Sequence, residues 1–162
     1  MLNAIDNHCI QNETITAIGQ FAVFWGMVEE QYFDKFCKEQ KIERMKIVKA
    51  SDGTVALAVR IKTALISHYG AQNINSIYEY LRLRNTVSVA SKIVRQFIEC
   101  EGSSDKDVVR AALFICYRIR NNMFHGEKVF WRLNEQKELI DACSEFLNAL
   151  LLGDVTLQIG QA

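Results

Sequence analysis

The most informative segment of this chain runs from Tyr117 to Gly126 and reads YRIRNNMFHG. It closes a helical pattern that begins near Ser104, and a glycine just after the last periodic residue is typical of a helix end. Within it, Arg120 and His125 stand five residues apart, and two asparagines follow the arginine directly. We therefore expect a long helix with polar chemistry at its C-terminal end, supported by the other helices.

Arg120 falls on the apolar side of this predicted helix. At about 100° per residue, four side chains lie within about 40° of one another: those of Val109, Leu113, Cys116 and Arg120. A guanidinium keeps its charge at any ordinary pH and is costly to bury unpaired, so Arg120 needs an anionic partner, either a protein carboxylate or a ligand. Arg118 falls on roughly the opposite side, where we expect an ordinary solvated residue.

His125 would lie about 140° around the helix from Arg120 if the last turn stayed regular. The two side chains reach one site only if that turn unwinds, or if a twofold-related copy of the chain brings its own pair alongside. Gly126 and the two asparagines favour local unwinding. Single histidines are usually structural, so the spacing alone does not establish a site.

Length and composition indicate one helical domain over residues 1–162. Apolar residues make up 49% of the chain, there is no proline, and there are only eight glycines, which favours long helices over a turn-rich β architecture. Lys plus Arg and Asp plus Glu balance at 19 each. This balance argues against a broad polybasic surface for nonspecific nucleic-acid binding and leaves room for a local basic cleft.

Outward from the key segment, the apolar spacing predicts an all-α fold, an up-and-down bundle of four to five helices over residues 13–152. A loose lead-in, residues 1–12, precedes the bundle, and a tail, residues 153–162, follows it. The expected helices span residues 13–38, 55–69, a stretch from a cap at Asn73 or Asn75 to residue 100 with a bend or break near 84–86, 104–126 and 134–153. Ser104 and Asn134 are the expected N-caps of the last two.

One helix and two shorter segments carry further expectations. The run from Phe21 to Val28 is apolar almost all round, which predicts that the first helix is central in the bundle, and Phe36 falls on its apolar stripe. Residues 39–53 are charged and irregular, which predicts a loop or a short helix. Residues 155–159 alternate apolar and polar, as a short strand or an extended arm on a neighbouring subunit would.

The cysteines and the N-terminal sequence indicate a cytoplasmic protein without a membrane span. Five widely spaced cysteines form no CxxC pair, and we expect them to be reduced core residues: Cys9, Cys37, Cys100, Cys116 and Cys143. The first residues show no basic region followed by an apolar run, so no signal peptide is expected. The longest apolar stretches fall short of a membrane span.

Other polar residues give weaker signals. Four basic residues could line an RNA path, although a solvated helix face is the more ordinary explanation for any one of them: Arg82, Arg84, Lys92 and Arg95. Glu29 is either a boundary carboxylate that touches solvent or the partner of a buried arginine. His68 stands at a predicted helix end, where the helix dipole favours it. No glycine loop for phosphate and no zinc spacing occurs, so we expect neither a nucleotide cofactor nor a metal.

The sequence RNNMFHG of residues 120–126, at the end of a long amphipathic helix, resembles the signature of the HEPN superfamily, whose name refers to higher eukaryotes and prokaryotes. The family motif is an arginine, a polar residue that is often asparagine, three further residues and a histidine. Arg120, Asn121 and His125 fill these places. The first helix, with a tryptophan followed by an acidic pair, also fits the family pattern. Beyond the motif, the resemblance covers residues 13–152 loosely, through architecture and spacing only.

The resemblance implies a helical bundle that commonly forms a homodimer, with two copies of the motif meeting at a cleft along the interface. Many members of the superfamily are metal-independent ribonucleases that act as toxins, in phage defence or in RNA processing, and others are inert scaffolds. Bacterial members are often encoded beside a small nucleotidyltransferase that acts as the antitoxin. The expected partners of this chain are therefore RNA, a second copy of the chain and such an antitoxin.

The residue types suit endoribonuclease cleavage without metal. Histidine titrates near neutral pH and can move protons, and arginine can clamp a phosphate and stabilise developing charge. His125 is then the general acid and base, and Arg120 is the phosphate clamp. Asn121 orients the histidine or forms a hydrogen bond with the RNA. Asn122 helps to end the helix. The expected products carry a 2′,3′-cyclic phosphate and a 5′-hydroxyl. The alternative is a non-catalytic HEPN-type dimeric scaffold that binds a partner protein or nucleotide, with Arg120 serving structure.

Overall fold

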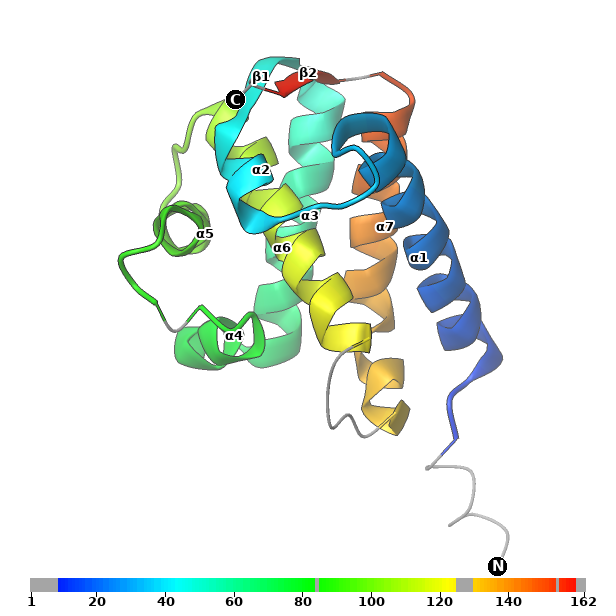
Figure 1. The fold of residues 1–162 in the computed structure, drawn as a ribbon. Coiled ribbons are helices and arrows are strands. Elements are labelled where there is room, and N and C mark those ends of the chain that lie inside the picture. The colour runs from blue at the N-terminus through cyan, green and yellow to red at the C-terminus, as the bar shows by residue number, and fades with distance from the viewer. Residues whose placement is uncertain (1–8, 84, 125–129, 154, 160–162) are drawn as a thin grey trace, which may run out of the picture.

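The computed structural model describes residues 9–83, 85–124, 130–153 and 155–159, which form seven α-helices and one two-stranded sheet (Figure 1). The α-helices are α1 (Asn12–Tyr32), α2 (Glu39–Arg44), α3 (Asp52–Tyr69), α4 (Ile74–Tyr80), α5 (Val89–Glu99), α6 (Asp105–Phe124) and α7 (Lys137–Leu151). A 3-10 helix, η2 (Phe130–Gln136), precedes α7, and the strands are β1 (Met45–Ala50) and β2 (Val155–Ile159). The expected all-α class is confirmed apart from this small sheet, and the helices outnumber the four to five expected.

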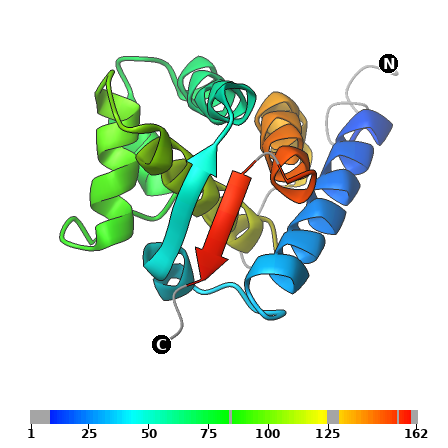
Figure 2. The ribbon, with the colours of Figure 1, turned by 90° about the horizontal axis from the view of Figure 1, so that it is seen from above.

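The longer helices pack in the order α1, α7, α3, α6 and α5, which Figure 2 shows from above. α6 is the central element, because α5, α3, α2 and β1 all pack against it. Four successive residues of α6, 112–115, are each 0% exposed. Since four successive residues cover a full helical turn, the middle of α6 is buried on every side. The single apolar stripe that the sequence indicates is only part of this buried surface.

α1 lies at the edge of this arrangement, which corrects the expectation of a central first helix. It packs mainly on α7, with Phe21, Trp25 and Val28 buried in the core, while apolar residues on its other side face solvent. The helix ends at Tyr32, earlier than expected. Phe36 is 72% exposed and does not belong to the apolar stripe.

A left-handed turn ends α1. Asp34 and Lys35 have φ angles of 50° and 72°. The N–H groups of Phe33 and Lys35 both donate to the carbonyl oxygen of Glu29 at 3.0 Å. Left-handed backbone of this kind satisfies the last carbonyls of a helix and favours glycine. The turn redirects the chain from α1 at the edge towards α2, which packs on α6.

The charged segment after this turn forms both α2 and β1, where the sequence indicated a loop or a short helix. β1 pairs antiparallel with β2, with Met45 opposite Ile159 and Ala50 opposite Val155. The tail is therefore a strand of the chain's own fold and does not form the arm on a neighbouring subunit that was its alternative.

The expected third helix is broken into α4 and α5, as its polar middle indicated. Arg82 adopts a left-handed φ of 53° just after α4. The Asn85 side chain then accepts the N–H of Val87 at 3.1 Å, and the Ser88 hydroxyl caps α5 by accepting the N–H of Ser91 at 3.1 Å. Short polar side chains that bond to nearby backbone in this way compete with a continuous helix.

One of the two expected N-caps is correct. The Ser104 hydroxyl accepts the N–H of Asp107 at 3.2 Å and caps α6. Asn134 does not cap the last helix, because α7 begins only after η2. Instead, the Asn134 side chain accepts the N–H of Gln11 and donates to the carbonyl of Cys9, each at 2.9 Å. It therefore ties the start of α1 to η2.

Replacing Lys35 with glycine is expected to stabilise the fold. A residue with a side chain in left-handed backbone carries a cost of about 1–2 kcal/mol, whereas glycine adopts this conformation freely and loses about 0.5–1 kcal/mol more chain entropy on folding. We expect Lys35→Gly to raise the free energy of unfolding by up to about 1 kcal/mol in urea denaturation.

The matched control is Lys92→Gly, the same substitution at an exposed residue in the ordinary helical interior of α5. It should lower the free energy of unfolding by about 1 kcal/mol. If both variants lowered the free energy of unfolding by similar amounts, Lys35 would not have the left-handed backbone described here.

Candidate functional site

The C-terminal end of α6 carries the polar residues that the sequence singles out. Arg120 and Asn121 lie close to this end and are both partly buried. The Nη1 group of Arg120 donates a hydrogen bond of 3.1 Å to Oδ1 of Asn121. His125, the third residue of the expected site, lies outside the described residues. Two of the three expected residues are thus in direct contact on one helix.

Arg120 lies near the turn that joins α1 to α2. Burial raises the pKa of the Cys37 thiol in this turn well above its ordinary value, and the Glu29 carboxylate adds to the rise, while the charges of Lys41 and Arg120 oppose it. Coulomb effects of this kind act over short distances, so the four groups belong to one neighbourhood. The Cys37 thiol therefore stays protonated at neutral pH and is no candidate nucleophile.

Glu29 closes the turn after α1. Its Oε1 accepts the backbone N–H of Cys37 at 3.0 Å. The ammonium group of Lys41 donates to the carbonyl of Phe33 at 2.5 Å in the same turn. Glu29 is half-buried, as expected for a carboxylate at the edge of the apolar surface. The partner in this hydrogen bond is a backbone N–H group and not an arginine. From the sequence, Cys37 was expected to be a core residue, which is confirmed, and no role was assigned to Lys41, whose segment was expected to be irregular.

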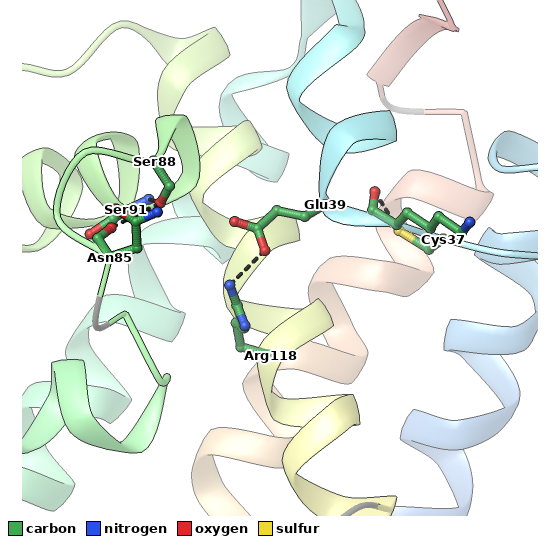
Figure 3. Close-up of polar contacts among 7 residues, drawn as sticks. Cys37, Glu39, Asn85, Ser88, Ser91 and Arg118 are labelled. Atoms are coloured by element: carbon green, nitrogen blue, oxygen red, sulfur yellow. Dashed lines mark hydrogen bonds and ion pairs between the residues drawn. The ribbon is translucent and has the colours of Figure 1, made fainter.

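Arg118 is not the solvated residue expected from its position on the helix. Its Nη2 forms an ion pair of 2.5 Å with Oε2 of Glu39, and the two side chains are only 23% and 20% exposed (Figure 3). α2 carries Glu39 and packs over this side of α6. Arg118 was placed correctly on the side of α6 opposite the apolar stripe. That side was expected to face solvent, but α2 covers it.

Asn122 lies inside α6, which runs past it to Phe124. Its side chain is buried, and Nδ2 donates to the backbone carbonyl of Tyr80 at the end of α4. Tyr80 is itself held by a 3.1 Å hydrogen bond from its hydroxyl to Oε1 of Gln136. Burial raises the pKa of the Tyr80 hydroxyl, which remains a protonated donor. Asn122 therefore ties the end of α6 to α4.

The four basic residues proposed as an RNA path have different environments. Arg95 stacks over the ring of Tyr78 at 4.0 Å and donates to the Leu83 carbonyl at 3.2 Å, so it holds the break between α4 and α5 together. Arg82 and Lys92 are exposed. Arg84 lies outside the described residues. The Arg95 side chain is therefore engaged in contacts within the fold. Arg82 and Lys92 are exposed, as an RNA contact requires.

A hollow of about 490 Å³ lies at the other end of α6, away from Arg120. Its lining includes Lys62, Phe97, Cys100 and Ser103. The Lys62 ammonium donates to the Cys100 carbonyl at 3.3 Å and lies 5.6 Å from the centre of the Phe97 ring. Arg120 and Asn121 do not line this hollow. The hollow therefore does not support the motif as a binding site.

Three of the five cysteines are buried, and two are not, which corrects the expectation of five core residues. All five are free thiols; Cys37, Cys116 and Cys143 are buried, and Cys9 and Cys100 are exposed. Exposed cysteines at the start of the chain and at the end of α5 are not core residues.

In the described part of the chain, no group of three or more His, Cys, Asp or Glu side chains is placed to hold a metal ion. No helix in that part is long and apolar enough to cross a membrane. Comparison with known proteins gives no match to a family model, to a curated protein or to a solved structure. The resemblance to the HEPN superfamily therefore rests on residues 120–126 and on helical architecture.

The ion pair between Arg118 and Glu39 is expected to contribute measurably to stability. Because both side chains are mostly buried, a double-mutant cycle of Arg118→Ala and Glu39→Ala should give a coupling free energy of about 1 kcal/mol or more in urea denaturation. The control is the pair of Arg60 and Glu145, whose side chains are 58% and 47% exposed. Its coupling should stay below about 0.5 kcal/mol because solvent screens it. Equal couplings would show that α2 does not cover Arg118.

Proposed function

We propose that this chain is a metal-independent endoribonuclease of toxin or phage-defence type that leaves 2′,3′-cyclic phosphate and 5′-hydroxyl ends. The observation that carries the proposal is the sequence Arg120-Asn121-x3-His125, with the Arg120 guanidinium bonded to Asn121 at the end of α6. In this proposal a nucleotidyltransferase-type antitoxin restrains the enzyme, and a second copy of the chain completes the cleft.

The proposed chemistry uses His125 for proton transfer, Arg120 for charge stabilisation and Asn121 for orientation. His125 removes the proton from the 2′-hydroxyl, the 2′-oxygen attacks the phosphorus, and the bond from phosphorus to the 5′-oxygen breaks. The leaving oxygen takes a proton from the imidazolium of His125, or of the same residue in the second copy. Arg120 stabilises the negative charge on the phosphate oxygens as it develops. Asn121 holds the guanidinium in orientation through their hydrogen bond.

The rigidity of α6 supports this assignment. Its middle turns are buried on every side, and Asn122 and Arg118 tie its last turns to α4 and α2. Catalytic side chains work best on elements that do not move relative to the core. Arg120 and Asn121 stand on such an element.

A non-catalytic HEPN-type scaffold that binds a partner protein or nucleotide is the second candidate. The observation in its favour is that Arg118 and Asn122, on either side of the motif pair, both serve contacts between helices. If Arg120 has the same role, its loss lowers stability and leaves no catalytic defect to measure.

The test is cleavage of mixed RNA by the purified protein in excess EDTA. We expect wild-type protein to leave cyclic phosphate ends, and His125→Ala and Arg120→Ala each to lose a factor of about 100 or more, because proton transfer and charge stabilisation each contribute at least that much. Melting curves of each variant separate loss of chemistry from loss of fold.

Matched controls are His68→Ala and Arg60→Ala, the same substitutions at residues outside the motif. His68 packs edge-on against Tyr69, and Arg60 pairs with Glu145 on the surface. Both variants should cleave as wild type does. Equal cleavage by all five proteins would assign the activity to a contaminant, and absence of cleavage by wild type would favour the scaffold.

A further inference from the structure

The hollow of about 490 Å³ lies where the chain turns from α5 into α6. Its lining comes from α3, the end of α5, the connecting turn and the start of α6. Sites for small molecules commonly have volumes of about 300–1,000 Å³ and apolar walls with a few polar groups. The aliphatic and aromatic residues of this lining are Val55, Val59, Ile66, Phe97 and Val108. The hollow therefore has the size and the walls of a small-molecule site.

Lys62 brings a positive charge to the hollow from α3. Its side chain is half-buried, and its ammonium group donates to the Cys100 carbonyl at 3.3 Å and lies 5.6 Å from the centre of the Phe97 ring. An ammonium group has three N–H donors. Lys62 forms no ion pair with a carboxylate in the part of the chain that the structure describes. It therefore keeps donors and an unpaired charge for an anionic group in the hollow.

Two carboxylates stand on other walls of the same hollow. Glu101 lies in the turn after α5, and Asp105 is the first residue of α6. Gly102 lies between them with a φ of 110°, a conformation that glycine adopts freely. Both carboxylates are exposed, and neither forms an ion pair with another described residue. The hollow thus presents unpaired charges of both signs beside an apolar surface.

A buried hydroxyl group also belongs to this lining. The Oγ atom of Ser103 is buried and has no hydrogen-bond partner among the described residues. Leaving a buried hydroxyl without a partner costs free energy, and such groups are uncommon in folded proteins. Because Ser103 is itself a lining residue, a polar ligand in the hollow can supply the missing partner.

We infer that the hollow binds an α-amino acid with a large apolar side chain. The ligand carboxylate pairs with the Lys62 ammonium and accepts the O–H of Ser103. The ligand ammonium donates to Glu101 and Asp105, and the apolar side chain lies against the valine and isoleucine side chains of α3. An apolar acid would meet two repelling carboxylates, and an apolar amine would meet the repelling charge of Lys62. A zwitterion satisfies the charges of both signs.

The openness of the charged groups to solvent predicts weak binding. Glu101 and Asp105 are exposed, so water screens their attraction to the ligand. For a ligand as small as phenylalanine we expect a dissociation constant on the order of a millimolar. This inference does not rest on the ribonuclease proposal, because it uses neither Arg120 nor His125.

The first test locates the ligand through Cys100, an exposed free thiol in the lining. Wild-type protein is alkylated with iodoacetamide, and the rates at Cys100 and Cys9 are followed by mass spectrometry. Phenylalanine at about ten times its dissociation constant leaves roughly a tenth of the protein free, so alkylation of Cys100 should slow up to about tenfold. Cys9 is also an exposed free thiol but lies outside the hollow, so its rate should not change.

The second test separates the three parts of the ligand by titration followed by NMR. Phenylpropionate lacks the ammonium group, phenethylamine lacks the carboxylate, and glycine lacks the apolar side chain. Each should bind at least about tenfold more weakly than phenylalanine, because a hydrogen bond to a charged group and a buried ring each contribute that much.

Three variants test the residues. Lys62→Met keeps the aliphatic stem and removes the charge, so it should weaken phenylalanine binding about tenfold and leave phenethylamine binding unchanged or stronger. Glu101→Gln should weaken phenylalanine and leave phenylpropionate unchanged or stronger. The control is Lys46→Met, at an exposed lysine of β1 outside the hollow, which should bind as wild type does. Melting curves show that each variant is folded.

Four results would overturn the inference. They are equal slowing at Cys9 and Cys100, no slowing at Cys100, binding of phenylpropionate or phenethylamine as tight as that of phenylalanine, and unchanged binding of phenylalanine to both folded variants, Lys62→Met and Glu101→Gln.

Discussion

Burial of α6 on every side is the constraint that the rest of the structure satisfies. Residues 112–115 have no exposed surface, so neighbours must cover all sides of this helix. α5, α3, α2 and β1 do so, and β1 is held in place by pairing with β2 from the other end of the chain. Close packing of this kind fixes the helix axis and leaves the turns on either side of this buried middle for polar contacts.

The polar residues at the end of α6 divide into two groups. Arg118 and Asn122 extend the packing, through an ion pair with Glu39 and a hydrogen bond to the Tyr80 carbonyl. Arg120 and Asn121 bond to each other and are partly buried. The first pair thereby holds the backbone that carries the second pair. This division explains how a sequence with two arginines and two asparagines in five residues can serve both structure and a proposed site.

Local patterns in the sequence predicted local structure well. The Ser104 cap and the break between α4 and α5 both follow from side chains that bond to nearby backbone. β1 was missed because its partner lies more than 100 residues later in the chain, and no local pattern encodes that pairing. Without β1 and α2, the cover over Arg118 was also missed.

The largest error has a different cause. The apolar sequence of α1 predicted a central helix, since apolar residues on every side usually mean burial on every side. In the structure the same residues leave Ile15, Val23 and Met27 in solvent. The sequence pattern shows that these residues are apolar but not which of them the fold covers. The candidate site has a similar limit, because spacing alone does not set the relative positions of Arg120 and His125.

The proposed ribonuclease would bind RNA at the C-terminal end of α6. Ultraviolet cross-linking to RNA, followed by trypsin digestion and mass spectrometry, tests it directly. Trypsin cuts after Arg120 and Lys128 and releases one peptide, residues 121–128, that contains both Asn121 and His125. The proposal predicts that this peptide carries the cross-linked nucleotide, and that Arg120→Lys, which keeps the cleavage site, weakens the cross-link. Cross-links confined to peptides from the hollow around Lys62 and Phe97 would contradict it.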